Sequence, residues 1–467
     1  MRDPETQAEP ATAPAAALAP YVPPYPPRPD KELSPLKLLA EARKNLLTIW
    51  PAQAFSMNFS GRVLFRRAVF ICNSPITVRK VFIDTDNFHA KAPQLRHALV
   101  PLVGDGLFVS TGELWKNRRA QIAPLAHISQ LPELSRSMTS AAQARGDAWE
   151  AKVGQEIDAL AEMAEMGATV ICSAVFGSGL GAKAARTVVK SFTEYQAAID
   201  QFDIISLLGL PDFIPRRQNG RVQKAAKQLR EIIDGLVRNI LADPGGEGSL
   251  ARAMAAGGMD RAGMDEAAIC NEAAVLFMAG YETTATTMAW VWFILSQDPQ
   301  TEARLHAEVD ALGGRPATHA DMADLPFTRA VAEETLRLYP PIPLQVREAR
   351  SPQRISSHDV PAGAVMILVA WLLHRNPKYW KDPDAFIPDR FMPGAAPPER
   401  YSYVPFSIGP RVCLGAAFGI TEVVLCIATL AQRYRLTLKP GWEVVPTCRL
   451  SLRPGDRLPM RVEARTR

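Results

Sequence analysis

A loop from Phe406 to Gly415 constrains the chain more than any other stretch, because it places one cysteine between glycines. Gly409 and Gly415 allow tight turns and a close approach of the backbone to a flat ligand. Arg411 lies two residues before Cys413 and supplies a positive charge suited to a carboxylate. Apolar residues resume directly after the cysteine and predict a helix. Cys413 would then lie near a helix N-terminus, where the dipole favours the thiolate over the thiol.

A lone cysteine among apolar residues is usually buried and structural, but the spacing of its neighbours indicates another role. Five residues fill the pattern F-x-x-G-x-R-x-C-x-G: Phe406, Gly409, Arg411, Cys413 and Gly415. In this the chain resembles the cytochrome P-450 family of haem-thiolate monooxygenases. The resemblance implies that Cys413 is the axial ligand of a haem b iron, where its thiolate favours O–O cleavage, and that the other four residues contact the cofactor. It also implies a mainly α fold with a small β region, in which haem lies between a long distal helix and the helix that follows the cysteine loop.

Trp115 and Arg119 are four residues apart and therefore share one face of a predicted helix. On its own this is an ordinary amphipathic pair. Beside the cysteine loop it matches the W-x-x-x-R motif of the same family. The resemblance implies that both side chains donate to the haem propionates, which need charge-matched donors in a partly buried site.

Residues 265–298 predict one very long helix, about 50 Å at 1.5 Å per residue. A glycine in mid-helix is costly, and a threonine that bonds back to the preceding turn bends a helix, so we expect a kink near Gly280. The segment Ala279-Gly280-Tyr281-Glu282-Thr283 resembles the family motif A/G-G-x-D/E-T. By resemblance the glycine leaves room for dioxygen, while Glu282 and Thr283 relay protons. Without the cysteine loop, the segment would be an unremarkable helix with β-branched residues.

Glu334 and Arg337 share a helix face at i, i+3, which alone is a common surface pair. Residues 386–391 read F-I-P-D-R-F and resemble the family's F-x-P-E-R-F, with aspartate at a position that tolerates either acid. The resemblance implies that Arg390 completes a structural cluster with Glu334 and Arg337. Such buried charges are tolerable only when paired, so losing one should prevent haem-loaded folding. Arg347 aligns with a third propionate-binding position.

Composition supports a globular protein with a sizeable core, since 47% of the residues are hydrophobic and 22% are charged. A net charge of +5 without long runs of one sign does not indicate nucleic-acid binding. The six cysteines form no C-x-x-C pair, which favours a reducing, cytoplasmic location.

Nine of the first thirty residues are proline, and no apolar stretch among them is long enough to cross a bilayer. We interpret residues 1–33 as a flexible tail and residues 34–467 as one haem domain without a transmembrane anchor.

The resemblance implies an enzyme that inserts one atom of O2 into a hydrophobic organic substrate. No flavin or iron–sulfur module is recognisable in the sequence, so NAD(P)H would deliver electrons through a separate ferredoxin or flavodoxin and its reductase. A soluble chain with such donors fits a bacterial origin. Two alternatives stay open: a haem-binding sensor or carrier without turnover, and a peroxide-driven enzyme. Glu282 and Thr283 favour oxygen activation, because family members that use peroxides often lack this pair.

Three regions of the chain are expected to lie at the surface, at the substrate pocket or between helices. Lys116 and Arg118 form either a basic docking patch for an acidic redox partner or a simply solvated face. Residues 85–110 are expected to cover the substrate pocket. Residues 202–215 either touch lipid or lie buried between helices.

Overall fold

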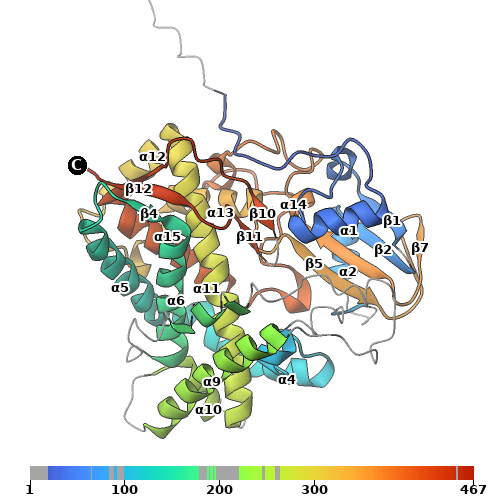
Figure 1. The fold of residues 1–467 in the computed structure, drawn as a ribbon, viewed down its shortest axis with the longest axis horizontal. Coiled ribbons are helices and arrows are strands. Elements are labelled where there is room, and N and C mark those ends of the chain that lie inside the picture. Colours follow the sequence, from blue (N-terminus) through green and yellow to red (C-terminus); the bar gives the residue numbers. More distant parts are fainter. Residues whose placement is uncertain are drawn as a thin grey trace, which may run out of the picture.

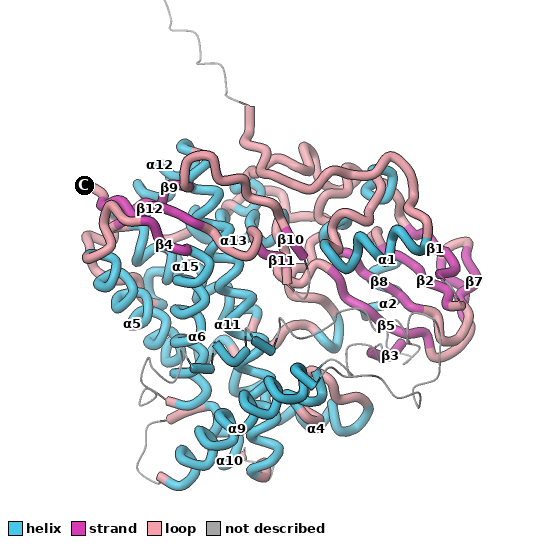
Figure 2. The backbone as a smooth tube through the Cα atoms, in the orientation of Figure 1, coloured by secondary structure: helices cyan, strands magenta, loops and turns pink. Residues whose placement is uncertain are grey.

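The computed structural model describes residues 19–64, 66–83, 89–91, 99–177, 187–188, 190–192, 194–195, 220–243, 248–257, 263–448 and 451–466. Helices gather on one side of the molecule and a twisted sheet with long loops on the other, as Figures 1 and 2 show. The predicted loop 202–215 lies outside the described residues, as do residues 85–88 and 92–98 of the predicted loop 85–110. The mainly α fold with a small β region is confirmed.

The elements follow the chain in a helix-rich order. The described helices are α1 (Pro35–Lys44), α2 (Pro75–Phe82), α4 (Gly112–Ile122), α5 (Leu131–Glu150), α6 (Ala159–Phe176), α9 (Gly220–Ala242), α10 (Leu250–Ala256), α11 (Glu266–Gln297), α12 (Pro299–Asp310), α13 (Pro326–Leu338), α14 (Ala370–Leu373) and α15 (Ala416–Ala431). The described strands are β1 (Phe59–Leu64), β2 (Arg67–Cys72), β3 (His89–Lys91), β4 (Glu156–Asp158), β5 (Leu344–Ala349), β6 (Gln353–Ile355), β7 (His358–Val360), β8 (Val365–Val369), β9 (Tyr434–Leu438), β10 (Thr447–Cys448), β11 (Leu452–Arg453) and β12 (Pro459–Ala464).

Helix α11 is the axis of the helical side (Figure 1). It begins after Asp265, whose side chain accepts a hydrogen bond from the backbone N–H of Ala268 at 2.7 Å, and it runs for 32 residues. Most of its side chains are buried, because it packs against α6, α9, α13 and α15. The single long helix expected over 265–298 is therefore present.

Helix α6 packs along α11 and is the one described helix that is long and apolar enough to cross a membrane by length and composition. In the fold, 67% of it is buried, and its neighbours are α5 and α11. A burial of this kind is typical of a core helix.

The larger sheet has the strand order β1-β2-β8-β5-β3, with β2 and β8 parallel and the other neighbours antiparallel. Strand β5 lies in the interior of this sheet and pairs Arg347 with Met366 of β8. The register thereby fixes the position of an arginine that the sequence assigned to the cofactor.

The N-terminal segment corrects the expectation of a flexible tail. From residue 19 onward the chain lies on the body of the protein, and residues 1–18 are outside the described residues. The carbonyl of Tyr21 accepts from the N–H of Phe386 at 2.8 Å, and the carbonyl of Pro24 accepts from the hydroxyl of Tyr339 at 2.6 Å. Proline removes backbone donors but leaves carbonyls free, so this extended segment is held by donors from other elements.

Arg28 is the main ionic anchor of that segment, and its removal should weaken the fold measurably. Its guanidinium pairs with Asp384 at 2.5 Å and lies 3.8 Å from the ring centre of Phe55. We expect Arg28→Ala to lower the free energy of unfolding by about 1–2 kcal/mol in urea titrations. Arg62→Ala, which removes an outer pair with Glu32 at 3.4 Å, is the control and should cost less than about 0.5 kcal/mol. Equal losses in the two variants would show that the segment is only loosely attached.

Candidate functional site

One strip of α11 is open although the helix around it is buried. Leu276, Ala279, Gly280 and Thr283 retain accessible surface, and their spacing of i, i+3, i+4 and i+7 places them on one face. We call these four residues the window. Across from it, α15 packs against α11, since a Cβ built on Gly419 would lie 3.5 Å from the methyl of Thr284. The loop that precedes α15 therefore lies beside the window.

Thr283 presents its hydroxyl at the window. Its Oγ1 donates to the carbonyl of Ala279 at 2.8 Å, and Thr284 makes the same type of bond to Gly280 at 2.9 Å. This back-bonding is the kind that bends helices. The helix nevertheless continues without interruption through the motif. With its proton held by Ala279, the oxygen of Thr283 can accept a hydrogen bond from a ligand at the window.

Gly280 has a packing role that the sequence did not indicate. A Cβ at this position would lie 2.8 Å from the side chain of Ile171 on α6. The glycine therefore permits the close approach of α6 and α11. This contact explains the glycine by helix packing. That Gly280 also leaves room for dioxygen stays a prediction.

Glu282 faces a different environment from its neighbour Thr283. It is 7% exposed, and its carboxylate accepts from the hydroxyl of Ser451 and from the guanidinium of Arg453 on β11. Consecutive helix residues point about 100° apart. Thr283 therefore reaches the window, while Glu282 reaches Arg453 on β11. A role for Glu282 in proton delivery stays a prediction.

The cysteine loop is shaped by backbone contacts. The N–H of Cys413 donates to the carbonyl of Phe406 at 2.9 Å. Gly409 has φ +73°, and a Cβ there would lie 2.2 Å from the carbonyl oxygen of Phe82, so this glycine serves the approach of the loop to α2. Gly415 is the N-cap of α15 and has open space around its Cα. The predicted helix start behind the cysteine is thus present.

Cys413 is the one exposed cysteine among the six. Desolvation by the surrounding protein raises the pKa of its thiol, while the N–H of Gly415 and the charge of Arg119 lower it. The other cysteines are buried, where thiols are inert. The only thiol available to a ligand is the one that the sequence motif selected.

Three of the predicted cofactor residues come together beside this loop. The guanidinium of Arg411 lies 4.4 Å from the ring centre of Trp115 and donates to the carbonyl of Ser110 at 3.2 Å. Arg119 donates to the carbonyl of Val412 at 2.7 Å, next to Cys413. Helix α4 therefore contacts the cysteine loop through the face that carries Trp115 and Arg119.

Arg347 adds a further cation that is 9% exposed. Burial lowers its pKa to about 10, and burial together with Arg347, Arg119 and Arg350 lowers the pKa of Arg411 to about 10. Within the described residues, Arg119, Arg347 and Arg411 take part in no ion pair with an acid. Buried cations need a counter-charge. As counter-charges, the two propionates of haem b fit these three cations.

Arg350 was not singled out from the sequence. It lies three residues after Arg347 and acts on the pKa of Arg411. A charged residue just beyond a short strand carries no sequence signal of such proximity, because the sheet register decides which cations meet.

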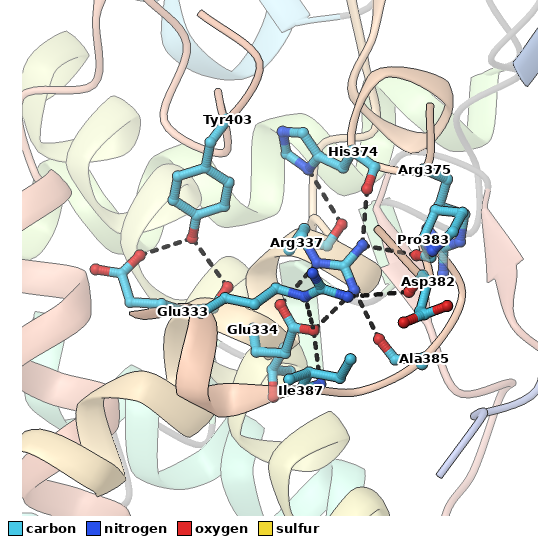
Figure 3. Close-up of polar contacts among 12 residues, drawn as sticks. Glu333, Glu334, Arg337, His374, Arg375, Asp382, Pro383, Ala385, Ile387 and Tyr403 are labelled. Atoms are coloured by element: carbon cyan, nitrogen blue, oxygen red, sulfur yellow. Dashed lines mark hydrogen bonds and ion pairs between the residues drawn. The ribbon is translucent and has the colours of Figure 1, made fainter. Parts of the chain in front are cut away.

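The structure brings Glu334, Arg337 and Arg390 together. Figure 3 shows the polar contacts of Glu334 and Arg337 in this cluster. Arg337 is fully buried and bonds both oxygens of Glu334 at 2.7 Å. Its remaining donors reach the carbonyls of His374, Pro383 and Ala385. The Nε of Arg390 lies 3.4 Å from Glu334. The cluster therefore has the paired charges that burial requires.

His374 links this cluster to the segment before the cysteine. Burial lowers its pKa to about 3, so the ring is neutral. Its Nε2 accepts from the N–H of Val404 at 2.9 Å, which leaves Nδ1 to donate to the carbonyl of Arg337 at 3.1 Å. Val404 precedes Phe406 by two residues, so the position of the loop depends on the cluster.

Glu422 is a further buried acid, and no sequence motif singled it out. It lies on α15, and burial raises its pKa well above the usual value. Its Oε1 is 3.2 Å from the hydroxyl of Thr284, and Gly167 of α6 leaves the space for this contact. A charged residue in the middle of an apolar helix was the available signal.

Arg118 corrects the expected basic patch. Its side chain is 12% exposed and lies 3.5 Å from Asp105 and 3.6 Å from Glu272. Lys116 is exposed but pairs with Glu113 at 2.6 Å. These two cations therefore do not form one free surface patch.

Comparisons with known proteins place the chain in one family. The family model described as cytochrome P-450 matches residues 46–455. Cyclooctatin synthase of Streptomyces melanosporofaciens is 31% identical over 399 residues, which are 83% of this chain and 85% of that protein. Cyclooctat-9-en-7-ol 5-monooxygenase of the same organism is 30% identical over 389 residues, which are 80% and 81% of the two chains. Among solved structures, the haem domain of a cytochrome P-450 matches with a TM-score of 0.75 and 21% identity, covering 88% of this chain and 89% of that one.

Proposed function

The chain belongs to the cytochrome P-450 family of haem b monooxygenases, and from this we propose that it hydroxylates a hydrophobic organic substrate. Electrons come from NAD(P)H through a separate ferredoxin or flavodoxin and its reductase. The location is the cytoplasm, in keeping with the reduced cysteines. Activity that depends on added reductase and ferredoxin, in a protein recovered from the soluble cell fraction, tests these points.

One observation carries the proposal: the exposed Cys413 lies in a loop beside an open strip of α11, and arginines that have no acid partner among the described residues lie around it. Haem b supplies the oxygen-activating iron when bound. Cys413 would hold the iron, while Trp115, Arg119, Arg347 and Arg411 would hold the propionates. Ala279 and Thr283 would then line the side of the cofactor on which the substrate lies.

The substrate class is inferred from the window and from the relatives. Leu276 and Ala279 supply an apolar surface beside the single hydroxyl of Thr283. One relative is named for oxygenation of cyclooctat-9-en-7-ol, an alkenol by its name. A cyclic hydrocarbon with few polar groups matches both observations.

A spectral titration of the ferric protein tests the substrate class. Fatty acids, terpenoids, steroids and small aromatic acids are added in turn, and the low-to-high-spin shift reports displacement of the iron-bound water. A saturable shift with terpenoids, followed by incorporation of labelled O2 into product, is the expected result. A normal carbonyl spectrum with no shift and no turnover would instead support a sensor or carrier.

Thr283→Ala should separate oxygen activation from peroxide use. The variant loses the only described hydroxyl of the window, so we expect haem and substrate to bind normally while product per NAD(P)H falls about 10-fold or more. The missing product should appear as hydrogen peroxide. Thr286→Ala is the matched control, because Thr286 makes the same back-bond on the same helix but is buried. Unchanged coupling in Thr283→Ala would remove this residue from proton delivery.

A further inference from the structure

Glu272 is a fully buried acid near the start of α11, outside the predicted motif. Both of its carboxylate oxygens accept from the N–H of Leu107, at 2.9 and 3.1 Å. The Nε of Arg118 on α4 lies 3.6 Å away. One acid on the long helix thus contacts both the loop that leads into α4 and α4 itself.

Asn271 ties the same loop down beside it. Its amide donates to Asp105 at 2.6 Å and accepts from Arg230 of α9 at 2.6 Å. Gly104 has φ +54°, and a Cβ there would lie 2.4 Å from the Asn271 side chain. The glycine therefore allows the backbone of the loop to lie directly on α11.

Two adjacent arginines connect α4 to α11 on one side and to the cysteine loop on the other. Arg118 reaches back to Glu272 on α11, while Arg119 reaches the carbonyl of Val412 in the cysteine loop. Ser110, at the end of the same loop, accepts from Arg411. The distance from the window to Arg119 and Arg411 therefore depends on how α4 is attached to α11.

We propose that Glu272 is a positioning residue that holds residues 102–110 and α4 against α11. Through Arg118 and Leu107 it sets where Trp115 and Arg119 stand relative to the window. Its carboxylate acts through Leu107 and Arg118, and not through a direct contact with Trp115, Arg119 or Cys413 among the described interactions.

The charge state of Glu272 makes this attachment sensitive to pH. Burial raises its pKa to about 7, and Asp105 adds to the rise, while the N–H of Leu107 and the charge of Arg118 oppose it. From α9, Arg230 with its partner Asp234 reaches Asn271 and faces the same cluster. The pKa of Glu272 is raised while residues 102–110 and α4 lie against α11. At pH values below the ordinary pKa of glutamic acid, Glu272 therefore stabilises this attached state. That contribution is lost as the pH rises through about 7.

Hydrogen exchange of the haem-loaded protein between pH 5.5 and 8 tests the proposal, after correction for intrinsic exchange rates. In the natural protein we expect protection of residues 102–110 to fall by about 10- to 100-fold as the pH rises. Glu272→Gln keeps an acceptor for Leu107 but cannot ionise, so its protection should be high and independent of pH. Glu272→Ala removes the acceptor, so its protection should be low at every pH.

Glu302→Gln is the matched control, because Glu302 is also a buried acid paired with an arginine, Arg435, at 2.9 Å. It should leave exchange in residues 102–110 unchanged. A second readout is transfer of haem to apomyoglobin, which should be faster for Glu272→Ala only, since α4 carries two propionate donors. The exchange measurement needs no turnover and stays readable if the proposed monooxygenation fails.

Two results would overturn the proposal. The first is an identical pH profile for the natural protein and Glu272→Gln. The second is protection of residues 102–110 in Glu272→Ala that equals that of the natural protein.

Discussion

Replacing Arg337 with alanine is expected to abolish recovery of folded, haem-loaded protein. Its five N–H donors meet five acceptors, two on Glu334 and three on backbone carbonyls, and the side chain has no exposed surface. The variant leaves the buried carboxylate of Glu334 with the backbone N–H of Ile387 at 2.8 Å and, as its only described counter-charge, the more distant Arg390. Removing one partner of a buried pair costs about 3–5 kcal/mol, against a total stability of about 5–15 kcal/mol.

The effect should reach the cofactor through His374 and Val404, which connect Arg337 to the cysteine loop. Soluble yield, haem content and urea unfolding measure it. Arg337→Lys keeps the charge but has three donors, so at least two acceptors lose their partners and an intermediate loss follows.

The matched control is Arg304→Ala, which removes a bidentate but exposed pair with Asp389. Exposed pairs contribute less than about 1 kcal/mol, so this variant should fold and load haem. If Arg337→Ala purified with normal haem content and an unchanged urea midpoint, the cluster would not be needed for folding.

Cys413→Ala is expected to remove the strongly red-shifted Soret band of the ferrous carbonyl complex, together with turnover. The band reports thiolate ligation, and Cys413 is the only exposed thiol. Its loop is held by backbone bonds such as the one from its own N–H to Phe406, so the fold should survive the change. Stability should therefore change far less than in Arg337→Ala.

Cys72→Ala serves as the control for this experiment. Cys72 is fully buried in β2, on the sheet side of the molecule. Its replacement should cost stability through lost packing but leave the carbonyl band in place. A band that persists in Cys413→Ala would assign the thiolate ligand to another cysteine.

Sequence predicted the parts of the site whose chemistry depends on local spacing. The thiol of Cys413 before a helix start, the pair Trp115 and Arg119 on one face of α4, and the 32-residue helix α11 were each readable from a short stretch. A helix period or a loop pattern determines such features within a few turns. The fold class and the cofactor, by contrast, were implied by the resemblance of these motifs to the cytochrome P-450 family.

Glycines were the least predictable residues. Ser60 and Gly61 are residue types common in turns, yet both lie inside β1. A Cβ on Gly61 would lie 2.4 Å from the ring of Phe70, its partner across the β1–β2 pair. Likewise Gly280 faces Ile171 of α6. Each glycine makes room for a side chain that is distant in sequence, and local patterns carry no information about that side chain.

By itself, the sequence determined the chemistry available to this protein: a thiolate, a set of cations, a hydroxyl on a long helix and a cluster of paired charges. Only the tertiary structure decided which member of each adjacent pair serves the site. Thr283 reaches the window while Glu282 turns to Arg453, and Arg119 reaches the cysteine loop while Arg118 turns to Glu272. The physical reason is the 100° step between consecutive helix residues, which sends neighbours in sequence to different partners once other elements pack around the helix.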